Sequence, residues 1–171
     1  MSTERPIPAK LARALHRELG TIGTQSVLLN QAIADRLGLY PTEVEVLDLL
    51  SRAGSLTAGD VARVTGLTSG AASRLIDRLE RAGYARRAPH PQDRRSVLVM
   101  PVAESIGREL VPLVAPLEQA LSACYGRYDE AQLGLIVEFL SRVNAITREH
   151  IARLRSRPPD NRPNSDKGEG P

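Results

Sequence analysis

The sequence predicts a mainly α-helical protein with one small β-hairpin. Apolar residues recur at helical spacing over most of residues 8–82 and 102–155, whereas only residues 84–100 alternate like paired strands. The chain has 171 residues, of which 42% are apolar and 25% charged, so it can bury a core. Its single cysteine, Cys124, excludes an internal disulfide framework and a multi-cysteine zinc site.

The first helical block covers residues 8–37, where leucines and isoleucines follow one face. The pattern loosens around Gly20 and Gly23, so we expect a bend or a break there and one or two helices. Pro41 suits the first position of the next helix, which ends at about Arg52. Tyr40 precedes this proline instead of a small polar capping residue, so we expect packing to fix the start of the helix.

The central segment predicts two short helices joined by a tight turn. Thr57 is a good N-cap with Asp60 placed to reach back to it, and Gly66 stops this helix. Thr68 then caps a second helix that runs to Gly83. Two such helices form a helix-turn-helix unit.

The second of these helices has two unlike faces. Its apolar residues gather on one side at about 100 degrees per residue. The opposite side carries Gly70, Ser73, Arg74, Asp77 and Arg81, and no acidic residue lies between positions 68 and 76. Backbone N–H groups, small side chains and one guanidinium are typical of a helix that enters a phosphate-lined groove. An ordinary surface helix with an Asp77–Arg81 ion pair is the alternative.

A hairpin follows, with strands predicted over 84–88 and 94–100 and turn residues between them. Asp93 and Arg95 lie on the same side of a regular strand, which lets the carboxylate orient the guanidinium. A basic hairpin tip beside a major-groove helix can reach the adjacent minor groove. A solvated, charged hairpin is the alternative.

Residues 102–125 and 129–155 predict two further helices. Pro112 and Pro116 lie inside the first of them, so we expect a kink. Asp129 and Gln132 form a capping-box pattern at the start of the second. The tail, residues 156–171, is rich in Pro, Gly and charge and is predicted to be disordered.

The net charge of +3 divides unevenly along the chain. Residues 52–95 hold nine arginines and four acids, a local charge of +5, which leaves −2 for the rest. Such a concentration indicates a polyanion-binding module, although dispersed solvated arginines give the same sum. The chain has only five aromatic residues, which argues against binding of single-stranded nucleic acid by base stacking.

Enzymatic motifs are absent from the sequence. The three histidines fit no HExxH or paired metal-ligand spacing, and there is no GxSxG or GxxxxGK[ST]. We therefore expect no enzymatic activity, no metal and no cofactor. The N-terminus lacks an apolar signal region and no stretch is long enough to span a membrane, so we expect a cytoplasmic protein without a membrane partner.

Residues 56–99, from the LT opening through RLIDRLERAGY to the DRR of the hairpin, closely resemble the winged helix-turn-helix of the multiple antibiotic resistance regulator (MarR) family. The flanking helices resemble the family more loosely. The resemblance implies a homodimer that reads a pseudo-palindromic double-stranded DNA operator. It places N-terminal dimerisation helices in residues 1–40, the DNA-binding domain in 41–101 and C-terminal dimerisation helices in 102–155. Carried over to this chain, the DNA contacts fall on Thr57, Ser69, Gly70, Ala71, Ser73, Arg74, Arg94 and Arg95, with Asp93 as the acid that orients the wing.

The sequence thus predicts a DNA-binding transcriptional regulator. By resemblance it is a repressor released by a small-molecule effector, whose pocket the sequence does not identify. The N-terminal helix lacks the reactive cysteine of peroxide-sensing relatives, and Cys124 is either an intersubunit disulfide partner or inert. A protein-binding adaptor with the same fold is the alternative function. Independently of the resemblance, the flanking helices carry apolar stripes that residues 41–101 are too few to cover, which also predicts a homodimer.

Overall fold

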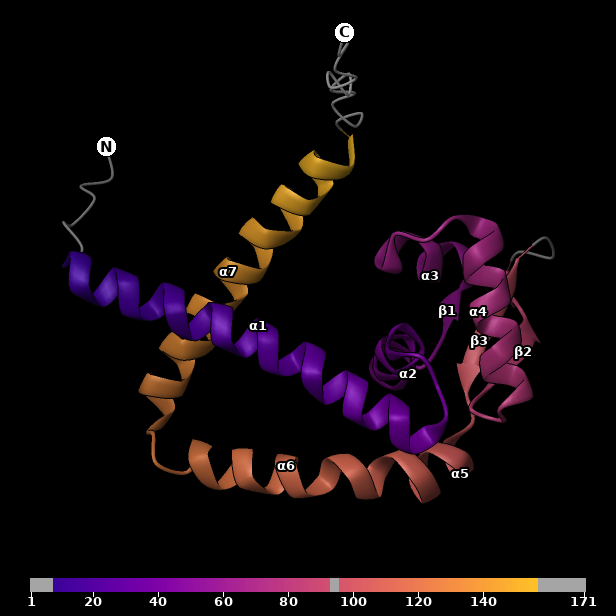
Figure 1. Cartoon of the computed structure of the whole chain (residues 1–171), viewed down its shortest axis with the longest axis horizontal. Coiled ribbons are helices and arrows are strands. Elements are labelled where there is room, and N and C mark those ends of the chain that lie inside the picture. The colour runs from indigo at the N-terminus through magenta and orange to yellow at the C-terminus, as the bar shows by residue number, and fades with distance from the viewer. Residues whose placement is uncertain (1–7, 93–95, 157–171) are drawn as a thin grey trace, which may run out of the picture. The chain divides into compact units, whose positions relative to one another are not determined.

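The computed structural model describes residues 8–92 and 96–156 (Figure 1). The chain falls into two compact units divided between Leu117 and Glu118. The division lies within helix α6. The helices are α1 (Ala9–Leu37), α2 (Pro41–Ala53), α3 (Ala58–Thr65), α4 (Ser69–Arg81), α5 (Ala103–Ser105), α6 (Val111–Tyr125) and α7 (Glu130–Ser156), with a π-helical segment, η1 (Ile106–Leu110), between α5 and α6. The predicted mainly α fold is confirmed.

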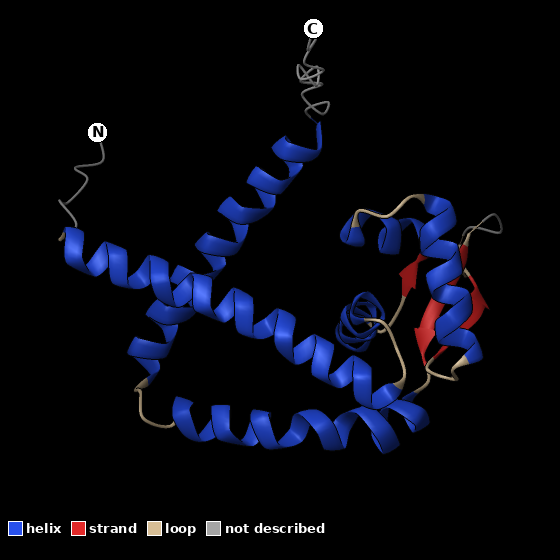
Figure 2. Ribbon diagram, viewed as in Figure 1, coloured by secondary structure: helices blue, strands red, loops and turns tan. Residues whose placement is uncertain are grey.

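Three antiparallel strands form the small sheet in the order β1-β3-β2 (Figure 2). Strands β2 (Ala85–Pro89) and β3 (Val97–Pro101) are the predicted hairpin. Strand β2 begins and ends one residue later than predicted, and β3 begins at Val97 and ends one residue later, with residues 94 and 95 of the predicted strand outside the described residues. Strand β1 (Leu56–Thr57) pairs with β3 on its other side. The sequence analysis missed β1, because two residues are too short to show an alternating pattern.

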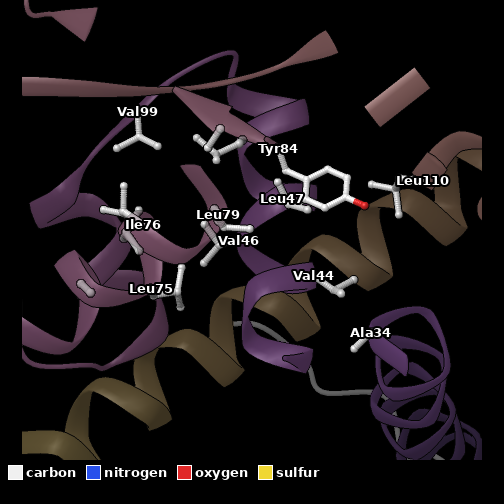
Figure 3. Close-up of a cluster of buried hydrophobic side chains, with 14 of the residues drawn as sticks. Ala34, Val44, Val46, Leu47, Leu75, Ile76, Leu79, Tyr84, Val99 and Leu110 are labelled. Atoms are coloured by element: carbon white, nitrogen blue, oxygen red, sulfur yellow. The ribbon is translucent and has the colours of Figure 1, made fainter. Parts of the chain in front are cut away.

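The core lies between α2, α4 and the sheet (Figure 3). Leu75, Ile76 and Leu79 of α4 are at most 1% exposed and lie beside Leu47 of α2 and Val99 of β3. Burying each such side chain contributes about 1.5–3 kcal/mol. The apolar face predicted for α4 is therefore its buried face, and the face with Gly70 and Arg74 is left outward.

The expected bend or break in the first helix is wrong, since α1 continues through Gly20 and Gly23. A helical glycine costs only about 1 kcal/mol relative to alanine, which the flanking helix-forming residues offset. The hydroxyls of Thr21, Thr24 and Ser26 donate hydrogen bonds to the carbonyls four residues earlier, so the side-chain polar groups of this stretch are bonded within the continuous helix.

The predicted helix over 102–125 is divided into α5, η1 and α6. The π-helical segment ends at Leu110, two residues before Pro112, and the Val111 N–H donates to the Ile106 carbonyl, five residues back. Pro112 has no N–H to donate to the regular α-helical hydrogen bonds, and a π turn accommodates such an interruption. Pro112 therefore lies in the first turn of α6 and not in the middle of one long helix. Pro116 lies within α6.

Helix α7 begins with the predicted capping box. The Asp129 carboxylate accepts the Gln132 N–H at 2.8 Å, and the Gln132 side chain accepts the Asp129 N–H at 3.0 Å. Ser156, predicted to open the tail, is the last residue of α7, and the rest of the tail lies outside the described residues. None of the described helices is long and apolar enough to cross a bilayer.

Candidate nucleic-acid interface

The start of α3 is held by the reciprocal cap that the sequence predicts. The Thr57 hydroxyl accepts the Asp60 N–H at 3.1 Å and donates to the Asp60 carboxylate at 2.7 Å, and the Thr57 N–H donates to the same carboxylate. These bonds, together with Arg63, lower the pKa of Asp60 to about 2. Thr57 is half-buried and its hydroxyl is committed to the cap.

The turn between α3 and α4 contains the predicted glycine stop and threonine cap. Gly66 takes a left-handed conformation, with φ of +75°, and its N–H donates to the Ala62 carbonyl. The Thr68 hydroxyl then accepts the Ala71 N–H at 3.3 Å. With α3 ending at Thr65 and α4 beginning at Ser69, the structure contains the predicted helix-turn-helix.

The first turn of α4 gathers the predicted contact residues at one exposed end. Ser69, Gly70 and Arg74 are exposed, and Ala71 and Ser73 are half-buried. The Thr68 hydroxyl accepts only the N–H of Ala71. The N–H groups of Ser69 and Gly70, which come before it in the first turn, have no acceptor among the described residues. The first turn contains no acidic residue. This end of α4 can therefore bind an anion.

Gly70 is not required by the fold itself. A Cβ built on it meets only the Arg74 Nη1 atom, at 3.8 Å, which is ordinary van der Waals contact. The bare backbone instead leaves the surface beside the Arg74 guanidinium open to a close neighbour.

The arginines of the basic segment divide into paired and unpaired groups. Arg78 donates to the buried carboxylate of Glu43, and its guanidinium lies 4.9 Å from the centre of the Tyr40 ring. Glu43 also accepts the Tyr40 N–H at 2.8 Å. Tyr40 itself provides no side-chain cap, as predicted, and this cluster ties the start of α2 to α4.

Arg87 of β2 bridges two carboxylates of α4. It donates to Asp77 at 2.7 Å and to Glu80, and its backbone N–H donates to Glu80 at 2.8 Å. The predicted alternative of an Asp77–Arg81 ion pair is wrong, because the Arg81 Nε donates to the Asp77 main-chain carbonyl. Partial burial lowers the pKa of Arg87, but Asp77 and Glu80 raise it overall.

Within the described part of the basic segment, residues 52–92, three arginines have no acidic partner: Arg74, Arg81 and Arg86. Arg74 and Arg81 lie two turns apart on the same face of α4, because seven residues nearly complete two helical turns. The wing residues Asp93, Arg94 and Arg95 lie outside the described residues. Within the described segment, the free positive charge is therefore concentrated on the outward face of α4 and on β2.

Tyr84 joins the hairpin to the segment before α6. It is buried, its hydroxyl donates to Glu109 of η1, and its carbonyl accepts the Val102 N–H at 2.9 Å. Burial and the Glu109 carboxylate raise the pKa of Tyr84 to about 12, and the Tyr84 and Arg108 hydrogen bonds hold the pKa of Glu109 below its usual value.

The sequence analysis missed Glu43, Arg78, Glu80, Arg87 and the Tyr84–Glu109 contact. One signal was available, because Glu43 falls on the same helical stripe as Leu47 and Leu50 and a buried acid requires a cationic partner. Its partner, 35 positions away, could not be chosen from spacing alone.

Comparison with known proteins agrees with this geometry. A family model described as the MarR family matches residues 37–96. An uncharacterized HTH-type transcriptional regulator of Bacillus subtilis (strain 168), YcgE, is 39% identical over 146 residues, which cover 85% of this chain and 92% of that protein.

Solved structures show the same fold. The apo form of wild-type MarR from E. coli superposes with a TM-score of 0.52 at 23% identity, covering 82% of this chain and 98% of that one. A mutant MarR from E. coli complexed with operator DNA gives a TM-score of 0.51 at 24% identity, covering 76% and 93%. With a winged helix-turn-helix in its structure and a relative that is 39% identical over 85% of its length, the chain belongs to the MarR family of transcriptional regulators.

Proposed function

We propose that this regulator is a homodimeric repressor that binds a pseudo-palindromic double-stranded operator and is released by a small-molecule effector. The observation that carries the proposal is the outward face of α4. It combines unbonded N–H groups, small side chains and the unpaired Arg74 at a helix start without acidic residues. These are the groups that phosphates and guanine edges require. The E. coli MarR mutant complexed with operator DNA supports the same use of the fold.

In this proposal Ser69, Gly70, Ala71, Ser73 and Arg74 contact DNA in the major groove. Arg94 and Arg95 reach the adjacent minor groove, with Asp93 orienting the wing. Thr57 contacts the DNA backbone in this proposal, but its hydroxyl already donates one hydrogen bond to Asp60 and accepts another. We therefore expect Thr57 to contribute least to DNA affinity among these residues. A cytoplasmic location is part of the same proposal.

The homodimer is supported by apolar surface that a single chain leaves uncovered. In α7, Leu135, Val137, Ile146 and Leu154 are between 61% and 68% exposed, and no residue of this helix is buried. In α1, the buried residues are confined to Ile33 and Ala34. Exposed apolar residues spread over helices of this length are typical of an interface between subunits. Residues 1–40 and 102–155 are therefore proposed as the dimerisation helices.

A two-fold dimer sets two α4 helices on one face of the duplex, about 34 Å or a multiple of it apart. An effector that favours another spacing would lower operator affinity by a population shift. Nothing in the described residues assigns the effector pocket.

The test is enrichment of genomic fragments by the full chain, followed by titration of the enriched duplex and light scattering. We expect an inverted repeat, two chains per duplex and affinity that falls steeply with salt. A stable monomer at micromolar concentration would contradict the dimer. Binding without salt dependence or sequence preference would favour the protein-binding adaptor instead.

A further inference from the structure

Strand β2 and helix α4 share the hydrophobic core and are also joined by one side chain, Arg87. The connection between them is short, with the Gly83 N–H donating to Glu80 and the Tyr84 N–H donating to Leu79. Beyond this turn, Arg87 reaches back to α4 and contacts Asp77 and Glu80. Its register partner across the sheet is Val99, which is fully buried. The Arg87 bridge therefore connects the outward part of α4 to a strand that is anchored in the core.

Glu80 also satisfies a backbone group at the edge of the sheet. Strand β2 lies at the edge, with β3 on one side, and its Arg87 N–H donates to the Glu80 carboxylate. An edge N–H without such an acceptor is left to water or to another chain. Both the main-chain N–H and the side chain of Arg87 therefore bond to α4. Together these bonds restrict the position and the orientation of β2 relative to α4.

Asp77 lies between two unpaired arginines on the outward face of α4. It is three residues after Arg74 and four before Arg81, which places it within about 6 Å of each along the helix axis. An unpaired carboxylate there would repel phosphates and draw the two guanidinium groups toward itself. Arg87 takes the Asp77 carboxylate instead, and neither Arg74 nor Arg81 forms an ion pair among the described residues.

We propose that Arg87 is a positioning residue for operator recognition, which fixes α4 against β2 and holds the Asp77 and Glu80 carboxylates away from the bound phosphates. The inference rests on the proposed function, because positioning matters only if α4 reads DNA. It differs from direct contact, in which Arg87 itself would bind a phosphate. Arg87 belongs to the basic segment, residues 52–95. In this proposal, however, it holds α4 in position and does not bind DNA itself.

Two variants with opposite charge changes separate these roles. R87M removes one positive charge and with it the side-chain bridge, whereas the double variant D77N/E80Q removes two negative charges and with them the ionic part of the bridge. R86M is the matched control, since Arg86 is exposed on the same strand and has no acidic partner among the described residues. Each full-length chain is titrated with the duplex enriched by the wild type and with a random-sequence duplex of the same length, at several salt concentrations.

The quantity that decides is the ratio of operator affinity to random-duplex affinity. Loss of an exposed ion-pair network is expected to lower this ratio about five-fold in both R87M and D77N/E80Q. R86M is expected to weaken both duplexes alike and to keep the ratio. If Arg87 contacts a phosphate directly, R87M loses affinity for both duplexes and its salt slope falls by about one, whereas D77N/E80Q binds at least as selectively as the wild type. That pattern would overturn the proposal.

Amide hydrogen exchange of residues 85–88 in the DNA-free protein tests the positioning without DNA. Faster exchange is expected in R87M and D77N/E80Q but not in R86M, and unchanged exchange in both bridge variants would overturn the positioning role. If the wild-type chain binds no enriched duplex more tightly than the random-sequence duplex, the proposed function itself is overturned. Any role of Arg87 in operator recognition is then overturned with it.

Discussion

The segment from α2 to β3 and the long helix α7 treat their apolar residues in opposite ways. In the first, Leu47, Leu75, Ile76 and Val99 are almost completely buried within one chain. In the second, no residue is buried. The helix-turn-helix and its sheet thus bury their apolar residues in one core together with parts of α1 and η1, whereas the apolar residues of α7 stay exposed in the single chain, as the proposed dimer requires. The following variants test this division.

The largest effect is expected from L75A in the core of the winged unit. Truncating a fully buried leucine typically costs about 2–5 kcal/mol, and Leu75 is 1% exposed. Urea unfolding followed by circular dichroism measures the loss. The matched control is L135A on α7, which removes the same atoms from a side chain that is 68% exposed. Equal losses of the free energy of unfolding at low protein concentration would break the distinction between the two regions.

A charge on the apolar face of α7 is expected to act on association rather than on the fold of the winged unit. In I146D, a carboxylate would be buried between subunits, which we expect to raise the dimer dissociation constant about 100-fold, in the range of an interface hot spot. Sedimentation equilibrium measures this constant, and E149A, which changes charge on the same helix, is the control. An unchanged dissociation constant would show that Ile146 does not face the partner.

Operator affinity should depend on Arg74 more than on arginines already held in ion pairs. R74A is expected to cost about 1–3 kcal/mol and to relax preference at one base position. R52A makes the same charge change in α2, where Arg52 pairs with Asp48, and should have a small effect on every sequence. Fluorescence anisotropy with single-base operator variants measures both. Equal losses would mean that charge alone, without the α4 geometry, accounts for binding.

The cap of α3 is expected to give a smaller, pH-dependent effect. The folded-state pKa of Asp60 is about 2, below its usual value of 3.8, so its contribution to stability is present above about pH 4 and is lost as the pH falls through 2. D60N should therefore cost about 1 kcal/mol at neutral pH, and the wild-type and variant free energies of unfolding should converge in acid. A constant difference down to pH 2 would rule out the ionised carboxylate as the source.

The smallest effect on stability is expected from G70A, and it should have the favourable sign. The added methyl group meets only the end of the Arg74 side chain, and alanine favours a helix over glycine by up to about 1 kcal/mol. Operator affinity should nevertheless fall, because the methyl group occupies the surface that DNA would approach. A variant that is more stable and binds DNA equally well would place the interface elsewhere.

The sequence predicted those parts of the site that depend on neighbours within one helical turn. The Thr57–Asp60 cap, the Thr68 cap and the stop at Gly66 all follow from residue types at fixed short spacing. The Glu43–Arg78 and Asp77–Arg87 pairs were missed or assigned differently, because packing of separate elements selects their partners. Likewise, the expected bend in α1 was wrong because two glycines destabilise a helix of 29 residues only locally.

The most direct test of the account is the salt dependence of binding of the full chain to its enriched duplex, compared between the wild type and R74A. We expect the logarithm of the wild-type affinity to fall linearly with the logarithm of salt concentration, by about 0.9 for each phosphate contacted. R74A should bind the operator more weakly and retain affinity for random duplex to within the loss of one such contact. Equal operator binding by the two proteins, or a slope near zero, would contradict recognition through α4.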